Sequence, residues 1–72
     1  DMDEIDAYGH DIALEIKYFY LKSDPFKVLR YPSRYKKLTS FFIYKKAFKG
    51  VDWNNIKKRL IRRAYDWTKI NG

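Results

Sequence analysis

A chain of 72 residues that contains no cysteine has to be held together by its apolar side chains or by a partner chain. A domain of this length buries only about 60% of the surface that its unfolded chain exposes, so its stability is marginal. No disulfide can help, and a single histidine without cysteines offers no ligand set for a structural zinc ion. Seven tyrosines, five phenylalanines and two tryptophans supply a dense core instead. We therefore expect one small domain over residues 1–72.

The positive charge of the chain is concentrated in its last two thirds. Residues 1–24 carry seven acidic and two basic side chains, a net charge of −5, whereas residues 25–72 carry fourteen basic and two acidic ones, a net charge of +12. So much positive charge on a small body favours a polyanion as the partner. DNA and an anionic membrane surface are the two candidates, and both would meet the basic part of the chain.

Nothing in the sequence is long enough to cross a bilayer. The longest apolar runs, residues 18–21 and 41–44, have four residues, whereas a spanning helix needs about 20, and no signal peptide is present. Since Asp1 precedes Met2, the chain does not begin as a translated protein begins. We therefore expect a C-terminal fragment of a longer protein, whose missing N-terminal part could carry an anchor.

The first expected helix, residues 3–22, is apolar on two faces. One stripe at helical spacing consists of Ile5, Tyr8, Ile12, Ile16 and Phe19. The opposite face carries Leu14, Tyr18 and Leu21, and Ile43 and Ala47 lie off the main stripe of a later helix. Apolar faces that a single chain leaves uncovered predict a homodimer with these five residues in its interface. The alternative is that packing within one chain uses both faces.

Capping residues divide the rest of the chain into a short element and two helices. Asp24 and Pro25 begin the short element, and Pro32 followed by Ser33 predicts a further helix over residues 34–48 that Gly50 ends. Asp52 is a good N-cap for the last helix, residues 53–70. The predicted fold class is all-α: a small bundle of three helices plus one short helix.

Basic residues with interleaved aromatic rings are the main functional signal. One face of the last helix carries Lys58, Arg62, Tyr65 and Lys69, flanked by Lys57, Arg59 and Arg63. The preceding helix would extend this face with Arg34, Lys36, Lys37, Lys45, Lys46 and Lys49. Lys and Arg neutralise phosphates, and an aromatic face stacks on an unpaired base for about 1–3 kcal/mol. The alternative is that these side chains form the solvated faces of amphipathic helices.

No group of residues in the sequence suggests catalysis. His10 lies beside Asp11 on an acidic helix, three scattered serines form no triad, and three glycines form no phosphate loop. The acidic residues of the first turn are those that a helix N-terminus favours, so they do not by themselves indicate a metal site. We expect no enzyme, no cofactor and no bound metal.

Residues 51–63 (VDWNNIKKRLIRR) resemble the third helix of a homeodomain, in which a tryptophan is followed after three residues by a basic pair and further bases. Ile56 stands where the homeodomain pattern has its adenine-reading asparagine, so the resemblance implies binding without base-specific reading. Non-specific binding through phosphates does not need that asparagine.

The whole chain is similar to the C-terminal domains of the membrane-anchored DNA replication organiser proteins of small protein-primed Bacillus phages. The similarity lies in the acidic first helix, the basic remainder and the ending RRAYDWTKING (62–72). It implies a homeodomain-related helical homodimer that binds single- and double-stranded DNA without sequence preference. It also implies multimers of dimers on DNA that bring viral replication to the host membrane. The anchor and coiled coil of that family are absent here.

Together these features predict sequence-independent DNA binding, with single strands preferred and duplexes also bound, by a dimeric domain that helps to organise viral replication. The predicted location is the host cell cytoplasm, at the membrane if the missing N-terminal part carries an anchor. The partners would be DNA, a second copy of the chain and viral replication proteins. The alternative is a protein-interaction module, or one that binds an anionic membrane surface, without direct DNA contact.

Overall fold

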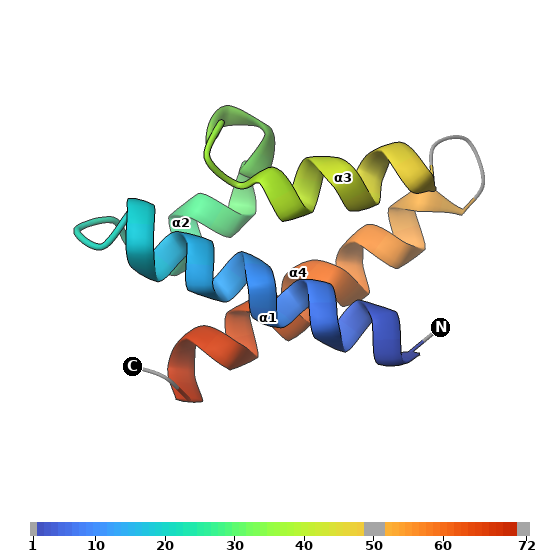
Figure 1. The fold of residues 1–72 in the computed structure, drawn as a ribbon, viewed down its shortest axis with the longest axis horizontal. Helices are drawn as coiled ribbons and strands as arrows, with labels where there is room; N and C mark the ends of the chain where they lie inside the picture. Colours follow the sequence, from blue (N-terminus) through green and yellow to red (C-terminus); the bar gives the residue numbers. More distant parts are fainter. Residues whose placement is uncertain (1, 49–51, 71–72) are drawn as a thin grey trace.

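The computed structural model describes residues 2–48 and 52–70, and in these residues it contains helices and no strand. In chain order the elements are α1 (Met2–Phe19), α2 (Pro25–Arg30), a short 3₁₀ helix η1 (Pro32–Arg34), α3 (Thr39–Ala47) and α4 (Trp53–Ile70). Figure 1 shows α1 crossing α4, with α3 lying along one side of the pair and α2 near the C-terminal end of α1. The prediction of a small all-α bundle is confirmed.

The crossing of α1 and α4 is close because Gly9 has no side chain. A Cβ atom added at Gly9 would lie 3.0 Å from Cγ and 3.1 Å from Cβ of Arg63, and 3.2 Å from the backbone nitrogen of Ala64. Backbone cannot withdraw as a flexible side chain can, so a larger residue here would push the helices apart. Ala64 is fully buried at this point. Near the same crossing, Trp67 Nε1 donates a hydrogen bond to Asp6 Oδ1 at 3.1 Å.

All four α-helices contribute to one core. The buried side chains are those of Ile5, Ile12, Ala13, Ile16, Val28, Leu29, Leu38, Phe41, Tyr44, Leu60 and Ala64. Aromatic pairs join the elements, with ring centroids 4.5 Å apart between Tyr8 and Tyr44 and 5.9 Å apart between Phe41 and Trp53. The predicted inner stripe of α1 is buried at Ile5, Ile12 and Ile16, whereas its last member, Phe19, is 48% exposed because α1 ends there.

Tyr44 places a hydroxyl in this core. The oxygen finds no hydrogen-bond partner among the described residues. Burial raises the pKa of the hydroxyl, and the nearby Glu4 carboxylate and Tyr8 raise it further. The Tyr44 hydroxyl therefore keeps its proton to a higher pH than the hydroxyl of an exposed tyrosine does.

The prediction that the third helix begins at residue 34 is wrong, because α3 begins at Thr39. Ser33, expected as its N-cap, lies within η1, where Tyr35 N donates to Pro32 O at 3.0 Å. The backbone N–H of Lys37 donates a hydrogen bond to the hydroxyl of Tyr20 at 3.0 Å. In a helix that began at residue 34, this N–H group would belong to the helix. Gly50, expected to end this helix, lies outside the described residues.

A carboxylate from another helix sets the start of α3. Leu38 is at the N-cap position, and its apolar side chain cannot accept a hydrogen bond. Glu15 of α1 takes that role, because its carboxylate accepts hydrogen bonds from Ser40 N at 3.2 Å, Ser40 Oγ at 2.8 Å and Thr39 Oγ1 at 2.9 Å. A negative charge at a helix N-terminus also interacts favourably with the helix dipole. These hydrogen bonds tie α3 to α1, and Figure 1 shows the course of the two helices.

The predicted side-chain cap of α2 is confirmed, and Asp52 lies just before α4 as predicted, but its Oδ1 accepts a hydrogen bond from the Asn55 side chain at 2.8 Å. Asp24 Oδ1 accepts a hydrogen bond from Phe26 N at 3.0 Å, and Pro25 is the first residue of α2. The carbonyl of Asp52 accepts from Ile56 N at 3.1 Å, so α4 begins at Trp53. The φ angle of Asp52 is 53°, a left-handed conformation that aspartate tolerates better than most residues.

Replacing Glu15 tests the cap between helices. Glu15→Ala should lower the free energy of unfolding by about 1–2 kcal/mol, because the N-terminus of α3 loses its only acidic acceptor. Urea unfolding followed by circular dichroism measures the change. Asp11→Ala removes the same charge from an exposed position on α1 and should change stability by less than about 0.5 kcal/mol. Equal losses in the two variants would show that Glu15 acts through net charge rather than as a cap.

Candidate nucleic-acid interface

The basic face of α4 points away from the core, because the apolar stripe on the opposite side of the helix is buried in the core. Leu60 and Ala64 are fully buried. Four basic residues on the rest of the helix surface are exposed, namely Lys58, Arg59, Arg62 and Lys69. This is the arrangement that an amphipathic helix adopts on one side of a small core. The charges of α4 are therefore available to a partner.

A groove between α2 and α4 brings basic and aromatic side chains together. It encloses about 670 Å³ and is lined by Phe26, Leu29, Arg30, Asn54, Lys57, Lys58, Ile61, Arg62 and Tyr65. Four of these residues are cationic, and no carboxylate is among them. Leu29, which is buried, and Ile61, which is half-buried, form the apolar floor of the groove. Such a groove attracts a flexible polyanion and offers it apolar surface.

The two aromatic rings of the groove contact each other. The ring centroids of Phe26 and Tyr65 are 6.0 Å apart, and their planes meet at 70°, an edge-to-face arrangement. The Nζ atom of Lys69 lies 4.7 Å from the centroid of the Tyr65 ring, within the range of a cation–π contact. Phe26 is 56% exposed, whereas Tyr65 is half-buried.

Two carboxylates pair with arginines of α4 without entering the groove. Arg62 Nε lies 3.8 Å from Asp66 Oδ1, one helical turn away, and both side chains are exposed. Exposed pairs of this kind are worth little, so Arg62 can exchange Asp66 for a phosphate at low cost. Arg63 Nε lies 3.4 Å from Asp6 Oδ1 of α1, which turns Arg63 toward α1. A shallower hollow of about 440 Å³ on that side is lined by Ile5, Lys58, Arg59, Arg62 and Arg63.

The predicted binding residues fall into separate groups. Those in the α2–α4 groove are Lys57, Lys58, Arg62 and Tyr65, with Lys69 against Tyr65, and those of the second hollow include Arg59 and Arg63. The residues expected on the preceding helix do not line the groove, and Arg34, Lys36 and Lys37 lie before α3 rather than on it. Lys45 and Lys46 are exposed on α3, and Lys49 lies outside the described residues.

The basic residues before α3 lie over aromatic rings. The guanidinium of Arg34 lies 4.6 Å from the ring centroid of Tyr31. The Lys37 ammonium lies 5.5 Å from the ring centroid of Phe19, and the Lys36 ammonium lies 6.0 Å from that of Phe42. These cations lie between the end of η1 and the start of α3, apart from the α2–α4 groove.

Five lining residues of the groove were not predicted as site residues, and two of these, Phe26 and Arg30, carry an aromatic ring or a charge. Phe26 and Arg30 belong to α2, whose short sequence was predicted only as an element that starts at Pro25. They are four residues apart, so a helix places them on one face. That spacing is the signal in the sequence that could have identified them. The spacing alone does not show that this face of α2 lies beside α4.

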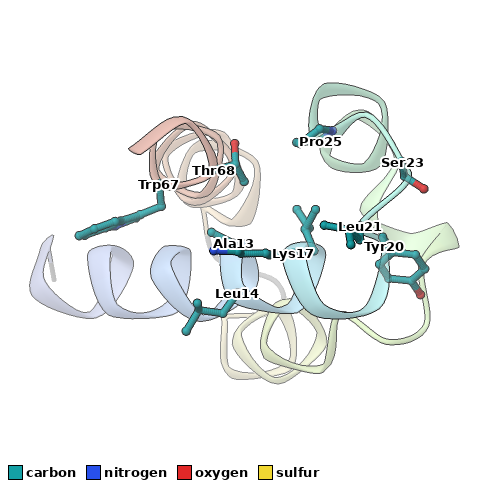
Figure 2. A pocket seen from close by; sticks show the side chains of 10 residues that line it. Ala13, Leu14, Lys17, Tyr20, Leu21, Ser23, Pro25, Trp67 and Thr68 are labelled. Carbon is teal, nitrogen blue, oxygen red and sulfur yellow. The ribbon is translucent and has the colours of Figure 1, made fainter. Parts of the chain in front are cut away.

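The predicted dimer residues remain uncovered within the chain. The exposed fractions are 44% for Leu14, 82% for Tyr18, 74% for Leu21 and 58% for Ile43, and Ala47 is also exposed. Packing within one chain therefore does not use both faces of α1, which was the alternative considered. A cavity of about 190 Å³ lies beside them, between α1, the start of α2 and the end of α4. Figure 2 shows Trp67 and Thr68 on one side of it and Ser23 and Pro25 on the other.

Other kinds of site are not found in the residues that the structure describes. Over residues 2–48 and 52–70, no three histidine, cysteine or acidic side chains gather so that they could hold a metal ion. His10 lies against Trp67, with ring centroids 4.6 Å apart in an edge-to-face arrangement. Among the described helices, none combines the length and the apolar character needed to span a membrane.

Comparisons with known protein families, with curated proteins and with solved structures found no match for this chain.

Proposed function

We propose that this chain is a dimeric domain that binds DNA without sequence preference, through the groove between α2 and α4. The observation that carries the proposal is the lining of that groove: four cationic side chains and two aromatic rings on an apolar floor, with no carboxylate. Phosphates replace the counterions around such cations, and the released counterions provide the driving force. Single strands are the preferred ligand because their bases are free to contact the apolar and aromatic surface.

The groove residues favour contacts to the backbone of DNA over contacts to base edges. Lys and Arg side chains bind phosphates in any sequence. Asn54 is the one lining residue with a side-chain amide, the group that reads adenine in many DNA-binding proteins. Ile56 is half-buried and packs against the core, and it does not line the groove. One amide does not specify a sequence, so binding should depend on charge and strand flexibility.

The uncovered apolar residues of α1 and α3 support the dimeric part of the proposal. Tyr18 and Leu21 are the most exposed of them. Large apolar side chains left in water favour burial against a second copy, and a closed dimer uses the same surface on both chains. A dimer carries twice the net charge of +7 and two α2–α4 grooves. Two grooves on one body allow simultaneous contacts to one strand, which strengthens binding without new chemistry.

The proposed biological role follows from the resemblance to phage replication organisers. In that role, dimers and multimers of dimers hold viral DNA at the host membrane, in the host cell cytoplasm. In the proteins that the chain resembles, an N-terminal anchor makes the contact with the membrane. Viral replication proteins would be further partners.

A second candidate function is binding to an anionic membrane surface. It is favoured by the hollow of about 620 Å³ on the outer face of α1, where Leu14, Tyr18, Phe19 and Leu21 lie beside Lys17, with Glu15 also in the lining. Apolar and aromatic side chains next to bases suit the interface of an anionic bilayer. The α2–α4 groove favours DNA more strongly, because four cations and no carboxylate line it. Vesicles that contain anionic lipid distinguish the two candidates at matched salt.

Replacing two cations of the groove tests the DNA-binding proposal. Lys58→Ala with Arg62→Ala should weaken binding to all unstructured oligonucleotides alike. The slope of log affinity against log salt should become shallower by about 1.4, because two phosphate contacts are lost at about 0.7 each. Fluorescence anisotropy over a salt series measures both quantities.

The matched control is Lys45→Ala with Lys46→Ala, which removes the same charge from α3. It should change the affinity and the salt slope less, because neither residue lines the groove. Equal effects of the two double variants would contradict a localised site. If the wild-type domain binds no oligonucleotide at low salt but sediments with anionic vesicles, the DNA-binding proposal is wrong and the membrane candidate takes its place.

A charge placed on the outer face of α1 tests the dimer. Sedimentation equilibrium of the wild-type domain should give twice the mass of one chain, and Leu21→Glu should give one chain at the same concentration. Lys27→Glu, an exposed change on α2, should remain dimeric. A wild-type domain that stays monomeric at every concentration would contradict the proposed interface.

A further inference from the structure

Phe26 is an exposed apolar ring beside four cations. It is 56% exposed, and it is absent from the group of residues that form or flank the core. The neighbouring residues Val28 and Leu29 are fully or nearly fully buried, so they anchor α2 without help from Phe26. A phenylalanine that contributes little to the core and lines a charged groove is available to a ligand.

Tyr65 supports Phe26 rather than offering its own ring to a ligand. Its ring contacts that of Phe26 edge to face at 6.0 Å. Lys69 lies 4.7 Å from the centroid of the Tyr65 ring and covers one of its faces. Tyr65 is also half-buried against the core. The sequence alone indicated Tyr65 as the stacking residue, but the geometry leaves Phe26 as the accessible ring.

The cations of the groove lie where they can hold the phosphates on either side of a base placed on Phe26. Arg30 follows Phe26 by one helical turn on α2, and Lys58 and Arg62 are one turn apart on α4. All three line the same groove as Phe26. A nucleotide whose base lies against the ring would thus place its backbone between cations of two helices.

Only an unpaired base can use the ring in this way. In a duplex, both faces of each base are covered by its neighbours, and reaching them requires unstacking. Phosphate contacts, by contrast, are available in single and double strands. Phe26 would therefore add to the affinity for single strands and leave that for duplexes unchanged.

We infer that Phe26 is a base-stacking residue that makes the α2–α4 groove prefer single-stranded over double-stranded DNA, with Tyr65 as the residue that positions its ring. This inference rests on the proposed DNA-binding function. It adds to that function the residue that distinguishes the two kinds of strand.

The test compares Phe26→Leu with the wild-type domain on an oligothymidine strand and on a duplex of the same length, by fluorescence anisotropy at matched salt. The affinity for the single strand should fall between about 5- and 150-fold, the range that one base stack provides. The affinity for the duplex should stay within about twofold. The salt slope should be the same in both proteins, because no phosphate contact is removed.

Two further variants make the result specific to stacking. Phe26→Trp keeps a large aromatic face and should bind the single strand at least as tightly as the wild type does. Phe19→Leu is the matched control, since Phe19 is 48% exposed with the Lys37 ammonium 5.5 Å from its ring centroid, yet it does not line the groove. It should leave both affinities unchanged.

The inference is overturned if Phe26→Leu leaves the single-strand affinity unchanged, or weakens single-strand and duplex binding equally. It is also overturned if Phe26→Trp loses single-strand affinity. In each of these cases the wild-type domain still binds DNA, so the proposed function stands. A wild-type domain that binds neither strand nor duplex would instead contradict the proposed function itself.

Discussion

The close approach of α1 to α4 at Gly9 is the contact on which the rest of the structure depends. A Cβ atom there would lie 3.2 Å from the backbone nitrogen of Ala64, so a larger residue would force the neighbouring atoms to shift. The contact seals the apolar stripe of α4 against α1 and leaves the opposite face of α4 in solvent. With no disulfide to hold the chain, this packing both stabilises the fold and presents the cations of α4.

The remaining elements are attached to this pair of helices, and each attachment shapes the surface. Leu29 brings α2 against α4, so that Phe26 and Arg30 complete a groove that α4 could not form alone. Glu15 binds the N-terminus of α3 to α1, and α3 then covers one side of the core. The acidic first part of the chain is thus largely structural, whereas the basic remainder carries the candidate site. The net charge of +7 is the sum of −5 on residues 1–24 and +12 on residues 25–72.

Local signals in the sequence predicted α4 and most of α1 correctly, because their caps and apolar spacing agree over many residues. They failed at α3, whose start depends on Glu15 and on the hydroxyl of Tyr20, both distant in sequence. The basic face of α4 was predicted from its spacing alone. Phe26 and Arg30 were missed because their role arises from the packing of α2 on α4. The homodimer stays a prediction, supported by uncovered residues such as Tyr18.

The central claim is that DNA occupies the groove between α2 and α4. Backbone amide shifts in the nuclear magnetic resonance spectrum of the domain, recorded during titration with an oligothymidine strand, test it most directly. If DNA binds in this groove, the largest shifts should cluster at Phe26, Arg30, Lys58 and Arg62, and the shift at Lys45 should stay small. Shifts that cluster on α3 or on the outer face of α1, with the groove unaffected, would contradict it.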